Sequence, residues 1–239
     1  MTDTEALRDD LCRALGIDPG EACLTRISGG DSHSAARLEG GDQQWFVKWN
    51  AASRHGAFEA ELDALGALAV DGGPILPTGL HAGSNGTRAW LITAWLDLRP
   101  HGDTLAFGRR LAELHRHSQP RFGWHATNTL GASRQDNRPE DTWREFWWSR
   151  RLAPQFERAM ASGWTPAADL DTIRRASDQL LQHDPCPALV HGDLWGGNHA
   201  YLPDGSPVIF DPAPYYGDRE TDMAMMRLFG GFHPVSYTH

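Results

Sequence analysis

One loop and the hairpin that follows it limit the possible folds of this chain more than any other feature. The loop covers residues 191–198 (HGDLWGGN), and Asp211 stands thirteen positions after Asn198. Apolar residues between them flank the turn sequence 203–205 (PDG), which predicts a β-hairpin. Such a hairpin would fold Asp211 back beside Asn198, so that two side-chain oxygens converge. Converging oxygen ligands suit a hard cation such as Mg²⁺.

The spacing of apolar residues changes near residue 100 and predicts two lobes. Before that point, short apolar runs separated by glycine predict antiparallel strands, with one helix at 56–70. Beyond it the spacing becomes helical, with Asp103 as the predicted N-cap, before short strands return. We therefore predict an α+β fold with two lobes. The N-terminal lobe (1–97) holds an antiparallel sheet plus one helix, and the C-terminal lobe (98–239) is mainly helical, with a ligand cleft between them.

Within this scheme the individual elements follow from period and turn signals. The predicted strands cover residues 24–27, 35–38, 45–49, 75–80, 88–96, 188–190, 199–202 and 208–210. Further helices are predicted at 4–15, 141–160, 167–183 and 219–229, with a loop over 119–140. The helix after Asp103 is predicted to bury Leu105, Gly108, Leu111, Ala112 and His115. Five tryptophans lie between residues 124 and 164, and we interpret them as core packing in preference to a sugar-stacking surface.

The polar groups of residues 191–198 have the spacing of the catalytic loop of protein kinases. An Asp follows His191 by two positions, and an Asn follows that Asp by five. In phosphoryl transfer, the Asp accepts a hydrogen bond from the attacking hydroxyl and the Asn supplies an oxygen to Mg²⁺. We predict Asp193 as the catalytic carboxylate, Asn198 and Asp211 as Mg²⁺ ligands, and ATP as the phosphoryl donor. Asp211 stands in Asp-Pro-Ala, where protein kinases have Asp-Phe-Gly.

The N-terminal half contains groups suited to nucleotide phosphates. Gly29 and Gly30 open a predicted hairpin whose backbone would lie over the phosphates, although no GxGxxG string is present. Lys48 follows on an apolar strand and is predicted to bind the α- and β-phosphates; a solvated edge-strand lysine is the alternative. This lysine needs an anionic partner from the next helix. We choose Glu61 because it borders the apolar stripe, with Glu59 as the alternative.

Two further groups of residues are assigned with less specific signals. Residues 91–97 run from a strand into a linker, where the backbones of Ala94 and Leu96 are predicted to contact adenine. Asp218 and Asp222 lie near the start of the last predicted helix. Either carboxylate would cap the helix or brace the backbone of the catalytic loop. We favour the bracing role for Asp222 and leave both roles open for Asp218.

Composition and charge restrict the class of partner. The formal net charge of −9 comes from 31 acidic and 22 basic residues, which disfavours nucleic acids and anionic membrane surfaces. No apolar run approaches the length of a membrane span, and residues 1–10 do not form a signal peptide. The three cysteines lack metal-type spacing and indicate reduced thiols, so we expect a cytoplasmic protein. The oligomeric state stays open.

Several longer strings resemble the fructosamine (ketosamine) kinase family. They lie at 46–48 (FVK), 122–124 (FGW), 135–137 (QDN), 143–147 (WREFW), 151–155 (RLAPQ), 189–198 (LVHGDLWGGN), 210–213 (FDPA), 215–220 (YYGDRE) and 228–232 (LFGGF). The resemblance covers about residues 24–232. Aminoglycoside and choline kinases share the HGD string and the later Asp, but not the tryptophan after HGDL or the GDRE string.

This resemblance implies a protein-kinase-like fold and a reaction. The γ-phosphate of ATP would pass to the O3 hydroxyl of a ketosamine, the adduct would break down, and the amine would be restored, which amounts to deglycation repair. Asp193 would orient that hydroxyl, and Trp195 is our hypothesis for a platform under the sugar. A kinase of another small hydroxylated molecule, such as an aminoglycoside or choline, is the nearest alternative. An ATP-binding module without turnover is the alternative from a different class.

The C-terminal end departs from this resemblance. The family continues beyond the GGF string into helices that help wall the acceptor side, whereas residues 232–239 (FHPVSYTH) do not resemble that continuation. A truncated C-terminal lobe would explain the difference. We therefore expect an intact nucleotide site and an incomplete acceptor pocket.

Overall fold

A five-stranded antiparallel sheet forms most of the N-terminal part of the molecule. The computed structural model describes residues 3–27 and 33–237. The strands lie in the order β1-β2-β3-β5-β4, and every neighbouring pair is antiparallel. Their bounds are β1 (Ala22–Ile27), β2 (Ser34–Gly40), β3 (Gln43–Ala51), β4 (Gly79–Ser84) and β5 (Arg88–Ala94). The three strands predicted before residue 50 are confirmed, whereas the predicted turn at Gly29 and Gly30 lies outside the described residues.

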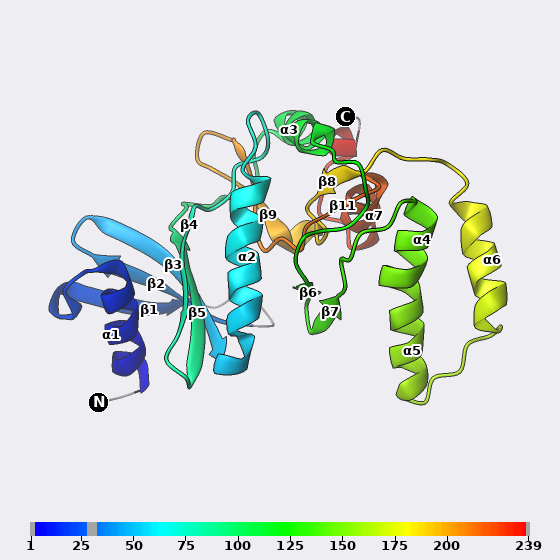
Figure 1. Cartoon of the computed structure of the whole chain (residues 1–239). Coiled ribbons are helices and arrows are strands. Elements are labelled where there is room, and N and C mark those ends of the chain that lie inside the picture. Colours follow the sequence, from blue (N-terminus) through cyan, green and yellow to red (C-terminus); the bar gives the residue numbers. More distant parts are fainter. Residues whose placement is uncertain (1–2, 28–32, 238–239) are drawn as a thin grey trace.

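Two helices, α1 (Asp3–Leu15) and α2 (His55–Leu68), cover opposite faces of this sheet (Figure 1). Leu11 of α1 packs into one apolar cluster with residues of β2, β3 and β5. Phe58 of α2 packs into a second cluster that contains Leu91 of β5. The helix predicted at 4–15 is confirmed as α1, so two helices pack on the sheet, where the predicted lobe scheme named one.

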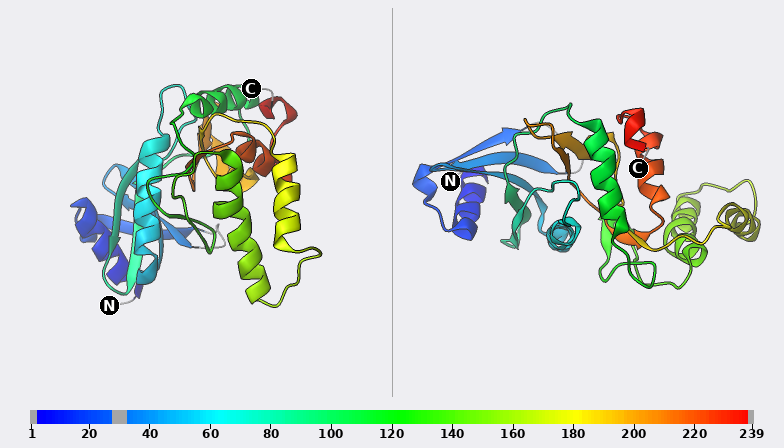
Figure 2. Two further views of the ribbon diagram at one scale, coloured as in Figure 1. Left: turned by 45° about the vertical axis from the view of Figure 1, so that its right-hand side comes forward. Right: turned by 90° about the horizontal axis from the view of Figure 1, so that it is seen from above.

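The remainder of the chain is mainly helical, with three two-stranded sheets. Its helices are α3 (Thr104–Arg116), α4 (Trp143–Trp147), α5 (Ala153–Ala161), α6 (Leu170–Leu180) and α7 (Glu220–Leu228), with a π-helix η3 (Trp148–Leu152) between α4 and α5. Its strands pair as β6 (Asn128–Leu130) with β7 (Ser133–Gln135), β8 (Ala188–Val190) with β11 (Tyr215–Gly217), and β9 (His199–Tyr201) with β10 (Pro207–Ile209). Figure 2 shows α5 and α6 extending away from the sheet as a helical arm.

Helix α3 lies at the centre of the larger core. Phe107, Leu111 and Leu114 are fully buried there, together with residues of β8, β10 and α4. The core also takes in Leu68, the last residue of α2. The end of α2 thereby anchors the sheet to the helical part of the molecule. The division of the chain at residue 97 stays a prediction.

Several local predictions were wrong, and each error has a physical reason. The strand predicted at 75–80 begins only at Gly79, because proline at 74 and 77 supplies no N–H to a ladder. Ile75 instead forms a parallel bridge with Val208. The predicted loop 119–140 contains the β6–β7 hairpin, whose strands are too short to show a period. Leu105 is 44% exposed, because the buried face of α3 carries Phe107 and Leu114 instead.

The tryptophan-rich region packs mainly as predicted. Trp124, Trp143 and Trp148 are buried, whereas Trp164 is half exposed. The predicted helix 141–160 is present as α4, η3 and α5, with the π-helical turn in its middle.

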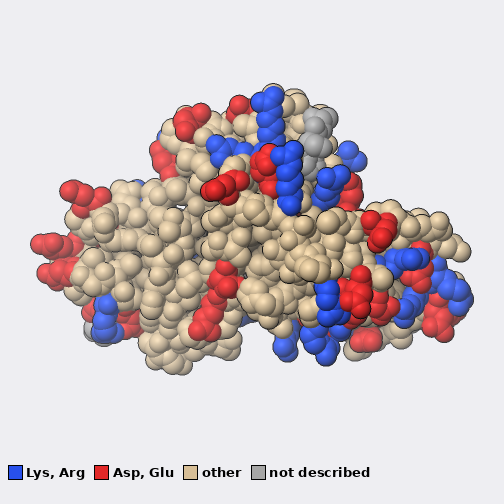
Figure 3. Space-filling model, turned by 45° about the horizontal axis from the view of Figure 1, so that its top comes forward, with Lys and Arg blue, Asp and Glu red and all other residues tan. Residues whose placement is uncertain are grey.

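Charged side chains of both signs are scattered over the face of the molecule shown in Figure 3. Figure 3 shows Lys and Arg interspersed with Asp and Glu over the helical part of the face it presents. Within residues 3–27 and 33–237, no helix has the length and apolar character needed to cross a membrane.

Candidate active site

Residues 191–198 form a loop between β8 and β9 whose path depends on glycine. Gly192 has φ +82°, and a Cβ there would lie 2.1 Å from the carbonyl oxygen of Ala213. Residue 192 therefore admits only glycine. The backbone N–H of Ala213 in turn donates to the carbonyl of His191 at 2.9 Å. The loop is thus held against the segment that contains Asp211.

His191 is buried beneath this loop and is neutral. Its Nε2 lies 3.0 Å from the carbonyl oxygen of Phe210, which can only accept, so Nε2 carries the proton. Its Nδ1 accepts a hydrogen bond from the backbone N–H of Asp193 at 3.3 Å. Burial lowers the pKa of His191 and favours this neutral tautomer. The side chain therefore connects the backbone of Phe210, the residue before Asp211, to the backbone of Asp193.

Asp222 holds the loop from the other side. Its carboxylate accepts the backbone N–H of His191 at 2.8 Å and that of Gly192 at 2.9 Å. The ring Nε2 of His115, on α3, lies 3.0 Å from the same carboxylate. Burial opposes the ionised form, but these hydrogen bonds and the His115 ring outweigh it and lower the pKa of Asp222. Asp222 thus makes the backbone contacts that a bracing residue requires.

Asp218 takes a different position at the start of α7. Its Oδ1 accepts the backbone N–H of Glu220, the first residue of α7, at 3.0 Å. Its Oδ2 lies 2.5 Å from Nε2 of His183. Asp218 thus contacts the backbone at the start of α7, and its role stays open between the two predictions.

Asp193 and Asn198 are joined by side-chain hydrogen bonds. The amide Nδ2 of Asn198 donates to the backbone oxygen of Asp193 at 2.8 Å and to its Oδ2 at 3.1 Å. The amide nitrogen is thereby committed to Asp193, so the amide oxygen is the atom that Asn198 has for a cation. Burial is the main cause that raises the pKa of Asp193 to about 7. A carboxylate with such a pKa is suited to accept a proton near neutral pH.

Lys48 is buried and lies at the centre of a three-residue ion network in which the Asp211 side chain is about half exposed. Its Nζ is 2.6 Å from Oε2 of Glu61 on α2 and 2.8 Å from Oδ1 of Asp211. Burial opposes the charged amine, but the two carboxylates outweigh it and raise the pKa of Lys48. Glu59 is exposed and faces His55, so Glu61 is the glutamate that pairs with the lysine.

Asp211 reaches this network through an unusual backbone conformation. Its φ of +56° lies in the left-handed region, which is sparsely occupied by residues other than glycine. The preceding N–H, of Phe210, donates to the carbonyl oxygen of Asn198 at 3.1 Å. The β9–β10 hairpin thus returns the chain to Asn198, as the turn sequence predicted. The Lys48 ammonium outweighs burial and lowers the pKa of Asp211, which keeps it ionised.

The donor atoms of Asn198 and Asp211 fit Mg²⁺ in kind. Both supply hard oxygens, and Mg²⁺ in kinases typically takes one or two protein ligands and fills its other positions with phosphate oxygens and water. Among residues 3–27 and 33–237 no cluster of three or more His, Cys, Asp or Glu side chains could hold a metal by itself. A cation held by Asn198 and Asp211 would take its remaining ligands from phosphate oxygens and water.

The two residues predicted to contact adenine, Ala94 and Leu96, differ in their backbone hydrogen bonds. The backbone N–H of Ala94 donates to the carbonyl of Thr78 at 2.9 Å, so Ala94 has only its carbonyl for a ligand. The Leu96 backbone makes no hydrogen bond within the described ranges. An acceptor on one residue and a donor two positions later suit the amino edge of adenine.

Trp195 projects from the catalytic loop toward solvent. It is 40% exposed, and its ring lies edge-on to Phe229 with ring centres 6.0 Å apart. The ring covers Gly197, where a Cβ would lie 2.2 Å from it. The exposed aromatic face is available for a flat apolar ligand surface.

Sequence reasoning missed two residues of the site. His191 was used only to count positions, and His115 was assigned to the core face of α3. The spacing His-x-Asp gave a signal for His191, because its ring can reach the backbone N–H of the residue two positions later. His115 acts through a residue more than a hundred positions away, so local spacing gave no signal for its contact with Asp222.

Kinases with a protein-kinase-like fold share two features. One is a lysine on a strand of the N-terminal sheet that pairs with a glutamate on the next helix, as Lys48 pairs with Glu61. The other is a loop with an Asp and an Asn that is followed by a second Asp. Comparisons with known proteins place the chain within that class. A family model described as fructosamine kinase matches residues 13–239. The chain belongs to the fructosamine kinase family. The matched range includes residues 232–239, which we expected to differ from the family.

Individual relatives agree with this placement. A probable ketoamine kinase of Synechocystis is 38% identical over 214 residues, covering 88% of this chain and 72% of the relative. A probable ketoamine kinase of Vibrio vulnificus is 36% identical over 237 residues, covering 98% and 82%.

Solved structures confirm the predicted fold. A structure from Haemophilus somnus named as a fructosamine-3-kinase superposes with a TM-score of 0.86 at 25% identity, covering 97% of this chain and 79% of that chain. One from Thermobifida fusca with the same name gives 0.79 at 30% identity, covering 95% and 79%. The aminoglycoside phosphotransferase APH(4)-Ia, at 13% identity and a TM-score of 0.60 over 92% and 75%, shares the fold.

Proposed function

We propose that this chain is an ATP-dependent ketosamine 3-kinase that phosphorylates the O3 hydroxyl of fructosamine or ribulosamine adducts, as part of deglycation repair. The observation that carries the proposal is the network of Lys48 with Glu61 and Asp211, next to the bonded pair of Asp193 and Asn198. Family membership and the names of the relatives support the same acceptor class.

In this proposal each residue of the network has one task. Lys48, held by Glu61, binds the α- and β-phosphates of ATP. Asn198 and Asp211 hold Mg²⁺, which would neutralise charge on the phosphates when bound. Ala94 and Leu96 present their backbones to adenine, and Gly29 and Gly30 remain proposed phosphate contacts. Asp222 positions the catalytic loop and touches neither substrate.

Asp193 acts on the acceptor. Its carboxylate accepts a hydrogen bond from the O3 hydroxyl and aims that oxygen at the γ-phosphorus. A bond forms between O3 and the γ-phosphorus, the bond from that phosphorus to the β,γ-bridging oxygen breaks, and ADP leaves. The hydroxyl proton passes to Asp193. Trp195 is proposed to lie against the apolar face of the sugar.

The location of the enzyme is part of the proposal. Cys12, Cys23 and Cys186 are all free thiols. Free thiols and the use of ATP support a cytoplasmic location.

The test measures ADP release from Mg-ATP with ribulosyl-lysine and fructosyl-lysine as acceptors. We expect acceptor-dependent turnover that disappears in Asp193→Asn, while the variant still binds Mg-ATP. Turnover with an aminoglycoside or choline, but with neither ketosamine, would show that the acceptor belongs to a different class of molecule. Nucleotide binding without turnover on any acceptor would reduce the chain to an ATP-binding module.

A further inference from the structure

A pocket lies between the start of α2 and the β6–β7 hairpin. Its volume is about 260 Å³, and it is lined on one side by residues 53–57 and on the other by residues 127–134. Figure 1 shows the hairpin beside the lower end of α2, and residues of β6 contact the helix. The pocket thus joins an element of the sheet-bearing part to an element of the helical part.

Two arginines line this pocket and have no partner in the described part of the chain. Arg54 precedes α2, and Arg134 lies in β7; no hydrogen bond or ion pair joins either guanidinium to residues 3–27 or 33–237. No acidic residue is among the lining residues. By contrast, Arg138 and Arg150 both pair with Asp136. In a chain with a net charge of −9, two unpaired arginines facing one pocket indicate a site for an anion.

The start of α2 adds positive potential to the same pocket. No side chain caps this end of the fourteen-residue helix, and its first turn contains no acidic residue. The N-terminus of a helix carries a partial positive charge that favours bound anions. Ser53, Thr127 and Thr129 add hydroxyl groups to the lining.

Asn128 gives an independent indication of a ligand. Asn128 lines the pocket, and only 6% of the residue is exposed. Its Nδ2 donates to the carbonyl oxygen of Pro214 at 2.7 Å, but its Oδ1 has no hydrogen-bond partner. A buried acceptor without a partner costs free energy. A hydroxyl of a protonated phosphate, or of the molecule that carries it, would satisfy this oxygen.

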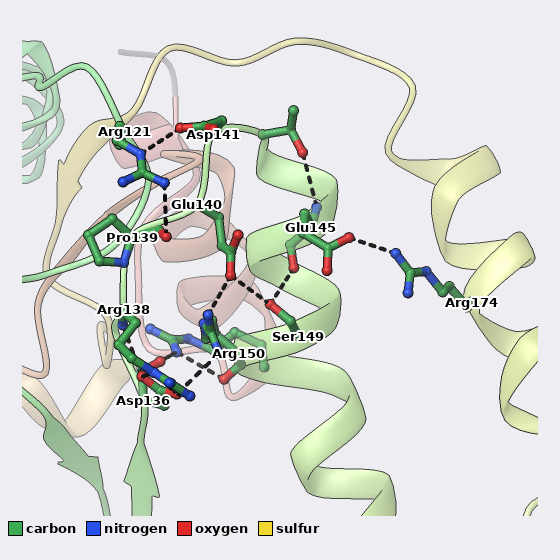
Figure 4. Close-up of polar contacts among 12 residues, drawn as sticks. Arg121, Asp136, Arg138, Pro139, Glu140, Asp141, Glu145, Ser149, Arg150 and Arg174 are labelled. Carbon is green, nitrogen blue, oxygen red and sulfur yellow. Dashed lines mark hydrogen bonds and ion pairs between the residues drawn. The ribbon is translucent and has the colours of Figure 1, made fainter.

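Ion pairs and hydrogen bonds connect the π-helix η3 to the residues that follow β7 (Figure 4). Arg150 of the π-helix pairs with Asp136 at 3.2 Å and also with Glu140. Arg151 donates to the carbonyl oxygen of Asp136 at 3.1 Å and to Oδ1 of Asn137 at 2.7 Å. The π-helical turn points both arginines at the residues that follow β7. The network therefore fixes the base of the hairpin before any ligand binds.

The pocket lies close to the predicted phosphoryl-transfer site. Asn128 contacts Pro214, three residues after Asp211. On the other side, burial lowers the pKa of His33, just before β2, and the charges of Lys48 and Arg54 act in the same direction while that of Asp211 opposes them. A ligand in the pocket would therefore be a neighbour of the nucleotide phosphates and of the acceptor.

We propose that this pocket is a second anion site that binds a phosphate-type oxyanion between Arg54, Arg134 and Asn128, separate from the phosphates of ATP. Two sources have this chemistry: a ketosamine acceptor whose sugar carries a terminal phosphate, or free inorganic phosphate. The acceptor source rests on the proposed ketosamine kinase function, whereas binding of the anion itself does not.

The first experiment measures binding of inorganic phosphate by calorimetry, with Mg²⁺ and a non-hydrolysable ATP analogue saturating the nucleotide site. We expect saturable binding that Arg54→Gln and Arg134→Gln each weaken about tenfold, the loss expected for one charge-assisted contact. Arg109→Gln, an exposed arginine on α3, is the matched control and should bind as the parent does. Binding that the ATP analogue abolishes, or that neither pocket variant changes, overturns the proposal.

A second variant guards against misfolding as an explanation. Ala57→Glu places a carboxylate in the first turn of α2, where it should stabilise the helix while occupying the anion site. We expect an unchanged or higher Tm without phosphate and loss of the phosphate-dependent rise in Tm. A variant that keeps the full phosphate-dependent rise contradicts the proposed site.

Kinetics distinguish the two sources. If the acceptor supplies the anion, a ketosamine with a terminal phosphate should show a KM about tenfold lower than its unphosphorylated form, and Arg134→Gln should remove that difference alone. If free phosphate is the ligand, the two acceptors should have equal KM values, and added phosphate should change turnover only in proteins that retain Arg134. If no ketosamine is turned over, the proposed function fails, and the calorimetric result still decides the anion site.

Discussion

The phosphoryl-transfer site and the aromatic surface beside it are built in different ways. Lys48, Asn198 and Asp222 are at most 5% exposed, and each is bonded to other residues of the site. Trp195, only three positions before Asn198, is 40% exposed, and its neighbour Phe229 is 66% exposed. The loop 191–198 therefore contributes one residue to a buried polar network and another to an open apolar surface.

The difference follows from the chemistry of the groups. A buried charge must be paired and hydrogen-bonded, because its desolvation is otherwise costly, so its geometry is determined by several partners at once. An aromatic surface gains contact energy without fixed directions and stays available until a ligand covers it. We therefore expect changes in the polar network to reduce the rate, and changes in the aromatic surface to reduce affinity for the acceptor.

The largest effect is expected from Asp211→Asn. This change removes a charged oxygen ligand of Mg²⁺ and one of the two carboxylates that hold Lys48. We expect kcat to fall about a thousandfold, because charge stabilisation in the transition state is the main source of catalysis here. The measurement is steady-state ADP release over a range of Mg²⁺ concentrations. Asp204→Asn, at the exposed turn of the β9–β10 hairpin, is the control and should keep kcat within a factor of about two. Activity retained in Asp211→Asn would remove this residue from the metal site.

Asp222→Asn tests whether the catalytic loop depends on its buried brace. The carboxylate accepts the N–H groups of both His191 and Gly192, and an amide would turn its own N–H₂ toward one of them. We expect the free energy of unfolding to fall by about 3 kcal/mol, the cost of leaving a buried donor unpaired. Because Asp222 touches neither substrate, kcat should fall by about tenfold with KM for ATP little changed. Chemical denaturation and steady-state kinetics measure the two effects. A variant with unchanged stability and kcat would show that the loop keeps its shape without this contact.

The same contrast explains what the sequence could predict. Asp193, Asn198 and Asp211 are related by short spacings and one hairpin, so local rules placed them together. Lys48 lies on β3 and Glu61 on the helix that follows, α2. The apolar stripe of α2 indicated which of its glutamates pairs with the lysine. The contacts from His115 to Asp222 and from Asn128 to Pro214 join distant segments, and three-residue strands such as β6 show no readable period. Such contacts arise from tertiary packing, which no local pattern encodes.

The aromatic surface is tested by Trp195→Ala. The exposed ring contributes little to folding, so the free energy of unfolding should change by less than about 1 kcal/mol. Loss of a stacking platform should raise KM for the acceptor about tenfold and leave KM for ATP unchanged. Trp164→Ala, a half-exposed tryptophan after α5, is the matched control. An unchanged acceptor KM in Trp195→Ala would show that the sugar does not contact this ring.

The smallest effect is a pH dependence that belongs to the polar network alone. Burial raises the pKa of Asp193 to about 7, and the charges of Asp211 and Asp222 act in the same direction. The ionised carboxylate is the form that accepts the hydroxyl proton. The value of kcat/KM for the acceptor should therefore fall as the pH falls below about 7, and rise by only about twofold above it.

A cation at Asn198 and Asp211 favours the ionised carboxylate of Asp193, so saturating Mg²⁺ should move this acid limb of the pH profile to lower pH. A limb that moves to higher pH with Mg²⁺, or a rate that increases in acid, would exclude Asp193 as the proton acceptor. The Trp195→Ala variant should keep the same limb, because the aromatic surface carries no titrating group.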